Sequence, residues 1–393
     1  MDANVREYYL LVLSGTLTML AGGLVWPVFA PYVRSEFTAP LQLVGYAVSG
    51  YFLLRMFTEF PIGVLSGRMG VKAPLVGGRL LALLGAIACY KTNNIWVLIL
   101  ARVIWGIGDA SFFCIGMTYV SGLFSAERRG RAMGFFQAVE MIGSLIGQTA
   151  AGVVASRMGP RFNFLATASI TLLALVTVSL TRGASAHPQI GGRLIPTWGE
   201  LAMALNRVVL VACLINLFCM MINNGLLGTI LPIYATELLG LSLSQYGLLV
   251  SASTVGSVAG NLAGGYLSDR VSRRKVLQGA LLIGMASIYS LTLFQAFLPL
   301  AATMFFKGVF WGSIYGVAPA YIADSVPPQV RGIGIGVFRT FMDMGGLVGP
   351  VVMSTLVETV GGSKGYIYSF YLSSALLVGL LASTLALGEE GQG

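Results

Sequence analysis

Long apolar stretches recur along the whole chain and limit most strongly how it can fold. Hydrophobic residues make up 56% of the 393 residues and charged residues only 10%, whereas a soluble domain carries about 25% charged residues. A helix needs about 20 mainly apolar residues to cross a bilayer. Twelve stretches meet this need approximately: 8–33, 42–65, 75–91, 95–121, 132–156, 162–181, 207–234, 245–267, 276–294, 297–323, 332–356 and 366–387. We therefore expect an all-α membrane protein with twelve transmembrane helices.

A short sequence pattern occurs twice and indicates that the chain is duplicated. Gly63 lies 202 positions before Gly265, and Arg68 lies 202 positions before Arg270. The same offset relates further pairs: Arg129 and Arg331, Gly134 and Gly336, Phe136 and Phe338, and Gly147 and Gly349. An offset shared by separate landmarks points to two related halves. We expect a six-helix bundle in 1–181, a linker in 182–206 with a short surface helix near Trp198, and a six-helix bundle in 207–393.

The distribution of basic residues predicts the orientation of the chain. If the N-terminus is cytoplasmic, the inner segments hold 14 lysine and arginine residues and the outer loops hold five. Cytoplasmic loops carry such an excess, so we expect both termini and the linker to be cytoplasmic in a multi-pass cell-membrane protein. The net charge of +9 then needs no nucleic-acid partner. The four cysteines lie in apolar stretches without metal-ligand spacing, and we expect no metal, no cofactor, no enzymatic activity and a monomer.

The C-terminal copy of the repeated pattern reads Gly265-x-Leu-x-Asp269-Arg270, followed by Arg273 and Arg274. It resembles the motif Gly-x-Leu-x-Asp-Arg-x-Gly-Arg-Arg that major facilitator superfamily transporters carry between helices 2 and 3. The resemblance covers essentially the whole chain. It implies two pseudo-symmetric six-helix bundles, transport of a small molecule by alternating access, and a motif that latches the two halves on the cytoplasmic side.

The N-terminal copy of the pattern is less complete. It keeps Gly63 and Arg68, but Gly67 stands where the family has an aspartate. An aspartate can pair with arginine and accept from helix N-terminal amides, and glycine can do neither. We therefore expect the intact latch to belong to the C-terminal half, with Asp269 as its acid.

Other segments extend the resemblance. The stretch from Arg102 reads Arg-x-x-x-Gly-x-Gly, which is similar to a pattern of the superfamily as a whole. Trp26-Pro27 lies in a segment similar to one found in the 12-helix drug:proton antiporter branch of the superfamily. Gly143-x-x-x-Gly147 resembles the start of the antiporter signature Gly-x-x-x-Gly-Pro-x-x-Gly-Gly, although Gln148 replaces its proline. These resemblances imply proton-coupled export of amphipathic compounds.

Charged residues inside the expected helices are the main candidates for function. Each costs at least about 2.5–3.5 kcal/mol at the bilayer centre, so it should face a cavity or another charge. The nine such residues are Arg55, Glu59, Arg79, Arg102, Asp109, Glu140, Lys307, Arg339 and Asp343. The framework glycines repeat between the halves while these charges do not, which favours assigning them to function.

Spacing along a helix separates these charges into two kinds. Arg55 and Glu59 lie four residues apart, as do Arg339 and Asp343, so each pair is either a self-neutralising bridge or part of a site. Arg102 and Asp109 lie seven apart, which places them on one face but roughly 10 Å apart along the axis. We expect each of these two to meet a partner from another helix.

Glu140 has no basic residue within four positions and belongs to a polar stripe with Gln137, Ser144 and Gln148. A carboxyl group in apolar surroundings favours its protonated form, so Glu140 is the first candidate for carrying a proton. A hydrogen bond to a neighbouring helix, for example to Arg102, is the structural alternative. Elsewhere, the stretch Asn223-Asn224-Gly225 predicts a local break in the helix at 207–234.

The leading hypothesis is a proton-coupled secondary transporter that exports amphipathic compounds by alternating access. The alternative is an uptake or exchange carrier for an anionic metabolite with a carboxylate or phosphate, and a polytopic enzyme or receptor is a remote third. Candidates for proton coupling are Glu140, Asp109, Glu59 and Asp343. Candidates for the substrate cavity are Arg102, Lys307, Arg339, Arg55, Gln137, Asn223, Trp26 and Tyr315.

Overall fold

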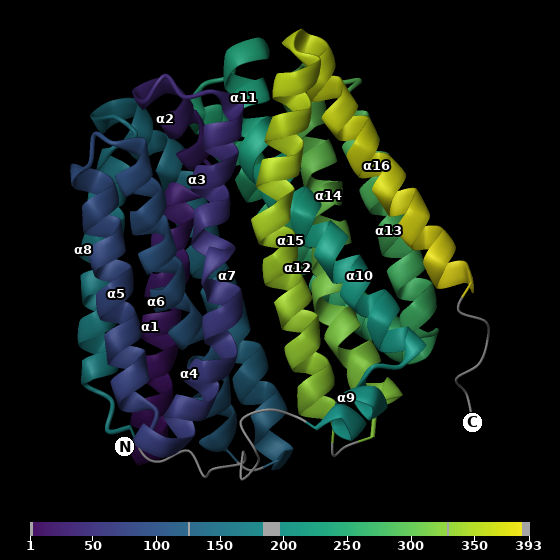
Figure 1. Cartoon of the computed structure of the whole chain (residues 1–393). Coiled ribbons are helices and arrows are strands. Elements are labelled where there is room, and N and C mark those ends of the chain that lie inside the picture. Colours follow the sequence, from purple (N-terminus) through teal and green to yellow (C-terminus); the bar gives the residue numbers. More distant parts are fainter. Residues whose placement is uncertain (1–2, 125, 184–196, 328–329, 387–393) are drawn as a thin grey trace. The chain divides into compact units, whose positions relative to one another are not determined.

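The computed structural model describes residues 3–124, 126–183, 197–327 and 330–386, and every regular element in these ranges is a helix (Figure 1). The helices of the first half are α1 (Ala3–Val25), α2 (Phe29–Glu36), α3 (Leu41–Leu53), α4 (Arg55–Met69), α5 (Lys72–Lys91), α6 (Ile95–Gly122), α7 (Ala126–Met158) and α8 (Phe162–Ser179). Those that follow are α9 (Trp198–Ala204), α10 (Arg207–Met221), η1 (Ile222–Ile230), α11 (Leu231–Ile233), η2 (Tyr234–Leu238), α12 (Leu243–Arg270), α13 (Arg273–Ser290), α14 (Phe297–Ser325), α15 (Arg331–Val360) and α16 (Gly362–Ala386).

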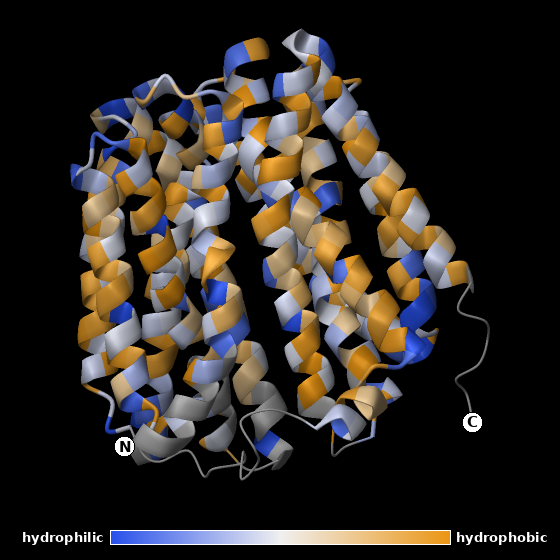
Figure 2. Ribbon diagram, viewed as in Figure 1, coloured by the Kyte–Doolittle hydropathy of each residue, from blue (hydrophilic) through white to orange (hydrophobic). Residues whose placement is uncertain are grey.

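Most of these helices are suited to a bilayer. Within the described residues, nine helical segments are long and apolar enough to cross it: those of α1, α5, α6, α7, α8, α10 to η2, α14, α15 and α16. Three further predicted spans correspond to α12, to α13 and to α3 with α4, and the last of these is interrupted by a turn at Leu54. Hydrophobic residues run along the long helices, while hydrophilic residues gather toward many of their ends (Figure 2). The predicted all-α membrane fold is confirmed.

The first predicted helix is interrupted. The prediction of one continuous helix over 8–33 is wrong in this detail, because α1 ends at Val25 and α2 begins at Phe29. Pro27 lies in the turn between them, where it lacks the N–H group that a continuing helix needs and its ring clashes with the preceding turn. The turn re-aims the chain so that Phe29 and Tyr32 are buried on α2.

The helical segment after α10 changes its geometry at the predicted break. The chain stays helical through Asn223 and Asn224, but Ile222–Ile230 forms wide π-helical turns, which recur at functional sites. The hydroxyl group of Thr229 donates to the carbonyl oxygen of Asn224 at 2.8 Å. Gly225 packs so closely on α15 that a side chain there would overlap the backbone of Gly349.

The helices form two compact units. Unit 1 comprises Met1–Ala39, Gly50–Leu194 and Ser242–Gly247, and unit 2 comprises Pro40–Ser49, Ile195–Leu241 and Leu248–Gly393. Most of the predicted linker, residues 184–196, lies outside the described residues. The short surface helix predicted near Trp198 is confirmed as α9, because Thr197 and Glu200 cap it reciprocally and Trp198 is exposed.

Candidate functional site

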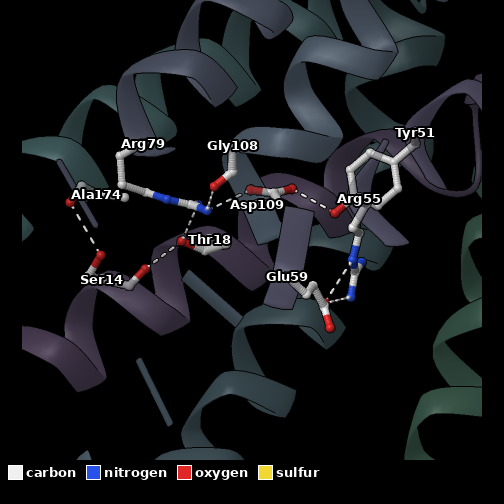
Figure 3. Close-up of polar contacts among 9 residues, drawn as sticks. All are labelled: Ser14, Thr18, Tyr51, Arg55, Glu59, Arg79, Gly108, Asp109 and Ala174. Carbon is white, nitrogen blue, oxygen red and sulfur yellow. Dashed lines mark hydrogen bonds and ion pairs between the residues drawn. The ribbon is translucent and has the colours of Figure 1, made fainter. Parts of the chain in front are cut away.

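A buried carboxylate on α6 lies at the centre of a polar network in unit 1 (Figure 3). The Oδ1 atom of Asp109 accepts from Nη2 of Arg79 on α5 at 2.7 Å, and its Oδ2 atom accepts from the hydroxyl group of Tyr51 on α3 at 2.8 Å. Asp109 is 7% exposed and Arg79 is 1% exposed. The prediction that Asp109 meets a partner from another helix agrees with this geometry.

Arg79 extends the network to two further groups. Its Nη1 atom donates to the hydroxyl oxygen of Thr18 on α1 at 2.9 Å, and its Nη2 atom also donates to the carbonyl oxygen of Gly108 at 3.3 Å. The Thr18 hydroxyl group in turn donates to the carbonyl oxygen of Ser14 at 2.8 Å. The Arg79–Asp109 pair therefore cross-links α1, α3, α5 and α6, and hydrogen bonds reach both carboxylate oxygens and both terminal nitrogens of the guanidinium group.

Glycines in the α6 sequence explain why this network forms. A side chain at Gly108 would overlap the backbone of Gly78 and Ala82 on α5, and one at Gly106 would overlap the carbonyl group of Tyr51. These two glycines let α5 and α3 approach α6 closely. They thereby position Arg79 and Tyr51 beside Asp109.

The second predicted pair in unit 1 is a local bridge. Nη2 of Arg55 lies 3.2 Å from Oε1 of Glu59, one helical turn further along α4 (Figure 3). The guanidinium carbon of Arg55 also lies 4.9 Å from the centre of the Phe113 ring. This ion pair is the bridge that is one of the two possibilities predicted from the spacing.

Arg102 has different surroundings from the other buried arginines of unit 1. Its guanidinium carbon lies over the rings of Phe29 at 4.5 Å, Tyr51 at 4.8 Å and Trp105 at 5.2 Å. The residue is 8% exposed, and its Nε atom, like that of Arg79, is buried without a hydrogen-bond partner. In the part of the chain that the structure describes, no carboxylate forms an ion pair with it.

Glu140 lies on α7, where that helix packs against α1. Side chains at Gly143 and Gly147 would overlap the backbone of α1, so the two helices are in close contact there. Glu140 is 8% exposed, and a Cβ atom on Gly15 would lie 2.5 Å from its Oε1 atom. No described residue forms a hydrogen bond or ion pair with Glu140, so the alternative of a bond to Arg102 is not realised in this structure.

The rest of the predicted polar stripe on α7 is half-buried. Gln137, Ser144 and Gln148 all have intermediate exposure. The side-chain amide of Gln148 donates to the hydroxyl oxygen of Ser144 at 3.0 Å. The stripe thus combines one buried acid with half-buried polar groups.

In unit 2, a buried lysine on α14 meets the π-helical segment. The ammonium group of Lys307 donates to Oδ1 of Asn223 at 2.9 Å, and Lys307 is 6% exposed. Asn223 belongs to η1, so the π-helical segment supplies a neutral amide as the partner of the Lys307 ammonium group. The other candidates of unit 2 lie on α14 and α15: Asp343 is fully buried, Arg339 is half-buried, and Tyr315 is 47% exposed and stacks on Trp311.

Trp26 is half-buried in the turn between α1 and α2. Gly63 and Arg68 fall within α4, but their side chains lie outside the described residues. In the C-terminal copy of the repeated motif, Nε of Arg273 pairs with Oδ2 of Asp324 at 2.5 Å, and Nη1 of Arg273 lies 3.9 Å from Oδ1 of Asp269.

Two other arginines of that copy have partners within unit 2. Arg274 donates to the carbonyl oxygens of Thr384 and Leu385, both at 2.8 Å, at the end of α16. The guanidinium carbon of Arg270 lies 4.2 Å from the centre of the Tyr266 ring. Asp324 was missed by the sequence reasoning because it lies 51 residues from Arg273 and outside the repeated pattern.

The model of the Major Facilitator Superfamily matches residues 11–220 and 213–391, nearly the whole chain in two halves. The chain belongs to this superfamily. Its fold resembles the crystal structure of a bacterial homologue of the human lysosomal transporter Spinster, with a TM-score of 0.83, 14% identity, and coverage of 98% of this chain and 97% of that one. The protein is therefore a multi-pass membrane transporter of the superfamily.

Two relatives of the chain are named for different transport activities. The protein is 22% identical to the proton-coupled antiporter flippase LtaA of Staphylococcus haemolyticus, over 95% of this chain and 92% of that one. It is 20% identical to the probable galactarate/D-glucarate transporter GudP of Escherichia coli, over 88% of this chain and 85% of that one.

Proposed function

We propose that this transporter exports amphipathic small molecules across the cell membrane in exchange for protons, and that Glu140 carries the proton. The observation behind the proposal is the burial of Glu140 beside Gly15 without a hydrogen bond or ion pair from any described residue. A buried carboxylate without a partner is costly, and protonation removes that cost. A group in this position can therefore couple proton binding to a change in conformation.

The other predicted acids of unit 1 are less suited to this role. Glu59 is bridged by Arg55, and Asp109 is bound by Arg79 and Tyr51. Protonation of either acid would leave a buried arginine without its counter-ion, which is strongly unfavourable. Of the acids expected to carry a proton in this unit, Glu140 is the one that can take up or lose a proton without breaking an ion pair.

The proposed direction and cargo rest on resemblance as well as on geometry. The name of LtaA describes a proton-coupled antiporter, and the segments around Trp26 and Gly143 are similar to those of drug:proton antiporters. Aromatic rings surround the buried charges of unit 1, as at Arg55 and Arg102. Such surroundings suit a substrate with both apolar and polar parts. The proposal includes cytoplasmic termini and alternating access between the two halves.

A proton-flux assay tests the proposal. The purified protein is reconstituted in liposomes that contain a pH-sensitive dye, and a panel of amphipathic compounds is added under an imposed pH gradient. We expect substrate-driven proton movement in the unchanged protein and its loss in Glu140→Gln. Glu36→Gln is the control, because Glu36 is partly exposed and pairs with Arg161 at 3.5 Å. Undiminished coupled proton flux in Glu140→Gln would remove Glu140 from the mechanism.

A second candidate function is transport of an anionic metabolite. Its support is Lys307, a buried cation whose hydrogen bond goes to the neutral amide of Asn223, together with the similarity to GudP. Uptake of D-glucarate into proteoliposomes tests it. We expect Lys307→Ala to abolish such uptake and Lys275→Ala, on the first turn of α13, to leave it intact. No D-glucarate uptake by the unchanged protein would exclude this sugar acid as a substrate.

A further inference from the structure

The charge on Arg102 is buried among aromatic rings without a neutralising group. The residue is 92% buried, three rings lie within 5.2 Å of its guanidinium carbon, and Nε has no hydrogen-bond partner. Rings facing a guanidinium group stabilise it by about 0.5–2 kcal/mol each. They do not supply acceptors for its N–H groups, which are expensive to bury unpaired. The N–H groups of Arg102, which lie in the plane of the guanidinium, can therefore donate to an acceptor on another molecule.

The nearby acids do not supply a hydrogen-bond acceptor or counter-ion for Arg102. Asp109 lies on the same helix, but Arg79 and Tyr51 occupy its two oxygen atoms. Glu59 is bridged to Arg55, and no described residue pairs with Glu140. Arg55 and Arg79 each form an ion pair, whereas no described carboxylate forms one with Arg102.

The shape of the group that fits follows from the geometry of a guanidinium. Its N–H bonds lie in one plane and match the two oxygen atoms of a carboxylate or phosphate in a bidentate arrangement. The rings of Phe29, Tyr51 and Trp105 lie within 5.2 Å of the guanidinium carbon and supply apolar surface beside it. An aromatic or other apolar substituent on the anion can pack against this surface.

We propose that Arg102 is an anion-binding subsite that takes the carboxylate or phosphate group of an amphipathic substrate, whose apolar part contacts Phe29, Tyr51 and Trp105. This inference rests on the proposed transport of amphipathic molecules and adds a charge requirement to it. The substrates are then anionic amphiphiles rather than neutral or cationic ones. Tyr51 links the subsite to the Asp109 network, because its ring contacts Arg102 and its hydroxyl group binds Asp109.

Equilibrium binding to the detergent-solubilised full chain tests the subsite with two probes of the same shape. Benzoate carries the carboxylate, and benzamide is its neutral counterpart. We expect benzoate to bind at least about tenfold more tightly than benzamide, the ratio given by one charge-assisted hydrogen bond. Arg102→Gln is expected to abolish this preference and to leave benzamide binding unchanged. Phenyl phosphate is expected to compete with benzoate.

Two further variants keep the test decisive. Arg102→Lys retains the charge but not the planar donors, so we expect it to reduce the preference for benzoate while the protein stays folded. Arg161→Gln removes an arginine that already donates to the carbonyl oxygen of Thr92 at 2.8 Å, and it is expected to leave the preference intact. Equal binding of benzoate and benzamide, or a preference that survives in both Arg102 variants, would overturn the proposal.

The outcome is separable from that of the proton-flux assay, because binding is measured without a gradient. Loss of coupled flux in Glu140→Gln together with equal binding of the two probes would remove only the anion subsite. A preference for benzoate that depends on Arg102, together with undiminished flux in Glu140→Gln, would remove only the proton role of Glu140.

Discussion

Asp109 and Glu140 are two acids of unit 1 with nearly the same burial, 7% and 8% exposed, and with opposite surroundings. Asp109 is bound by an arginine and a tyrosine, whereas no described residue forms a hydrogen bond or ion pair with Glu140. The difference shows that burial alone does not assign a role to an acid in a membrane helix. Asp109 is held in an ion pair, and the absence of such a pair at Glu140 is the basis of the role that we propose for it.

The largest expected effect is on stability when the bound acid is neutralised. Asp109→Asn leaves Arg79 buried without a carboxylate, and we expect it to lower the free energy of unfolding by about 3–5 kcal/mol. Glu140→Gln is the matched isosteric change at equal burial, and we expect less than about 1 kcal/mol. Thermal unfolding in detergent measures both. Equal losses of stability would contradict the assignment of different roles to the two acids.

The next largest loss of stability is expected at Tyr51, which contacts both Arg102 and the carboxylate of Asp109. Tyr51→Phe removes the hydrogen bond to Asp109 but keeps the ring over Arg102. A hydrogen bond to a charged group contributes about 1.5–3 kcal/mol, so we expect a loss of stability near the lower end of that range. Benzoate affinity is expected to stay within about twofold, because the binding atoms of Arg102 are unchanged.

Tyr119→Phe is a matched control for this measurement. The Tyr119 hydroxyl group also donates to a buried carboxylate, that of Glu7, at 2.8 Å. It lies outside the Asp109 network, so its loss should affect stability without changing benzoate binding. A large fall in benzoate affinity in Tyr51→Phe alone would show that the hydroxyl group itself takes part in the subsite.

Much of the fold follows from the sequence, and much less of the site does. The apolar stretches, the 202-residue offset and the spacing of Arg55 and Glu59 predict features that depend on neighbours along one helix. Arg79 and Asp109 lie 30 residues apart on different helices, and helical spacing carries no information about contacts between helices. Gly106 and Gly108 are the sequence feature that indicates close helix packing at this position. They do not indicate which helices pack there.

The aromatic surroundings of Arg102 were likewise beyond the sequence. Phe29 belongs to α2, Tyr51 to α3 and Trp105 to α6. Their convergence depends on the turn at Pro27 and on the contact of α3 with Gly106. The sequence shows that no basic residue lies within four positions of Glu140. That no described residue from another helix pairs with it is a finding of the structure.

A hydrogen-bond donor added beside Glu140 should stabilise its ionised carboxylate, as Arg79 and Tyr51 do for Asp109. Gly15→Ser brings a hydroxyl donor next to its carboxyl group. A donor stabilises the ionised form, so the proton is released at lower pH. We expect the pH midpoint of coupled flux to fall by about one unit, since 1.36 kcal/mol corresponds to one unit.

Gly15→Ala is the control for the contact itself, because it introduces the same Cβ atom without a donor. The contact falls on the flexible end of a side chain, so the helices need not separate. This variant should alter the midpoint much less than the serine does. Equal shifts in the two variants would mean that displacement of the carboxyl group, rather than its missing donor, sets the pH dependence.

The smallest effect is expected where an ion pair is exposed. The Arg273–Asp324 pair is as short as 2.5 Å, but its side chains are 25% and 59% exposed. Water and salt screen such a pair, so we expect Asp324→Asn to change stability by less than about 1 kcal/mol and the change to shrink as salt is raised. Asp269→Asn, with its longer 3.9 Å contact, should change stability less still. A loss of stability in Asp324→Asn as large as that in Asp109→Asn would show that the length of an ion pair matters more than its burial. The different stabilities expected for the Asp109 and Glu140 variants would then need another explanation.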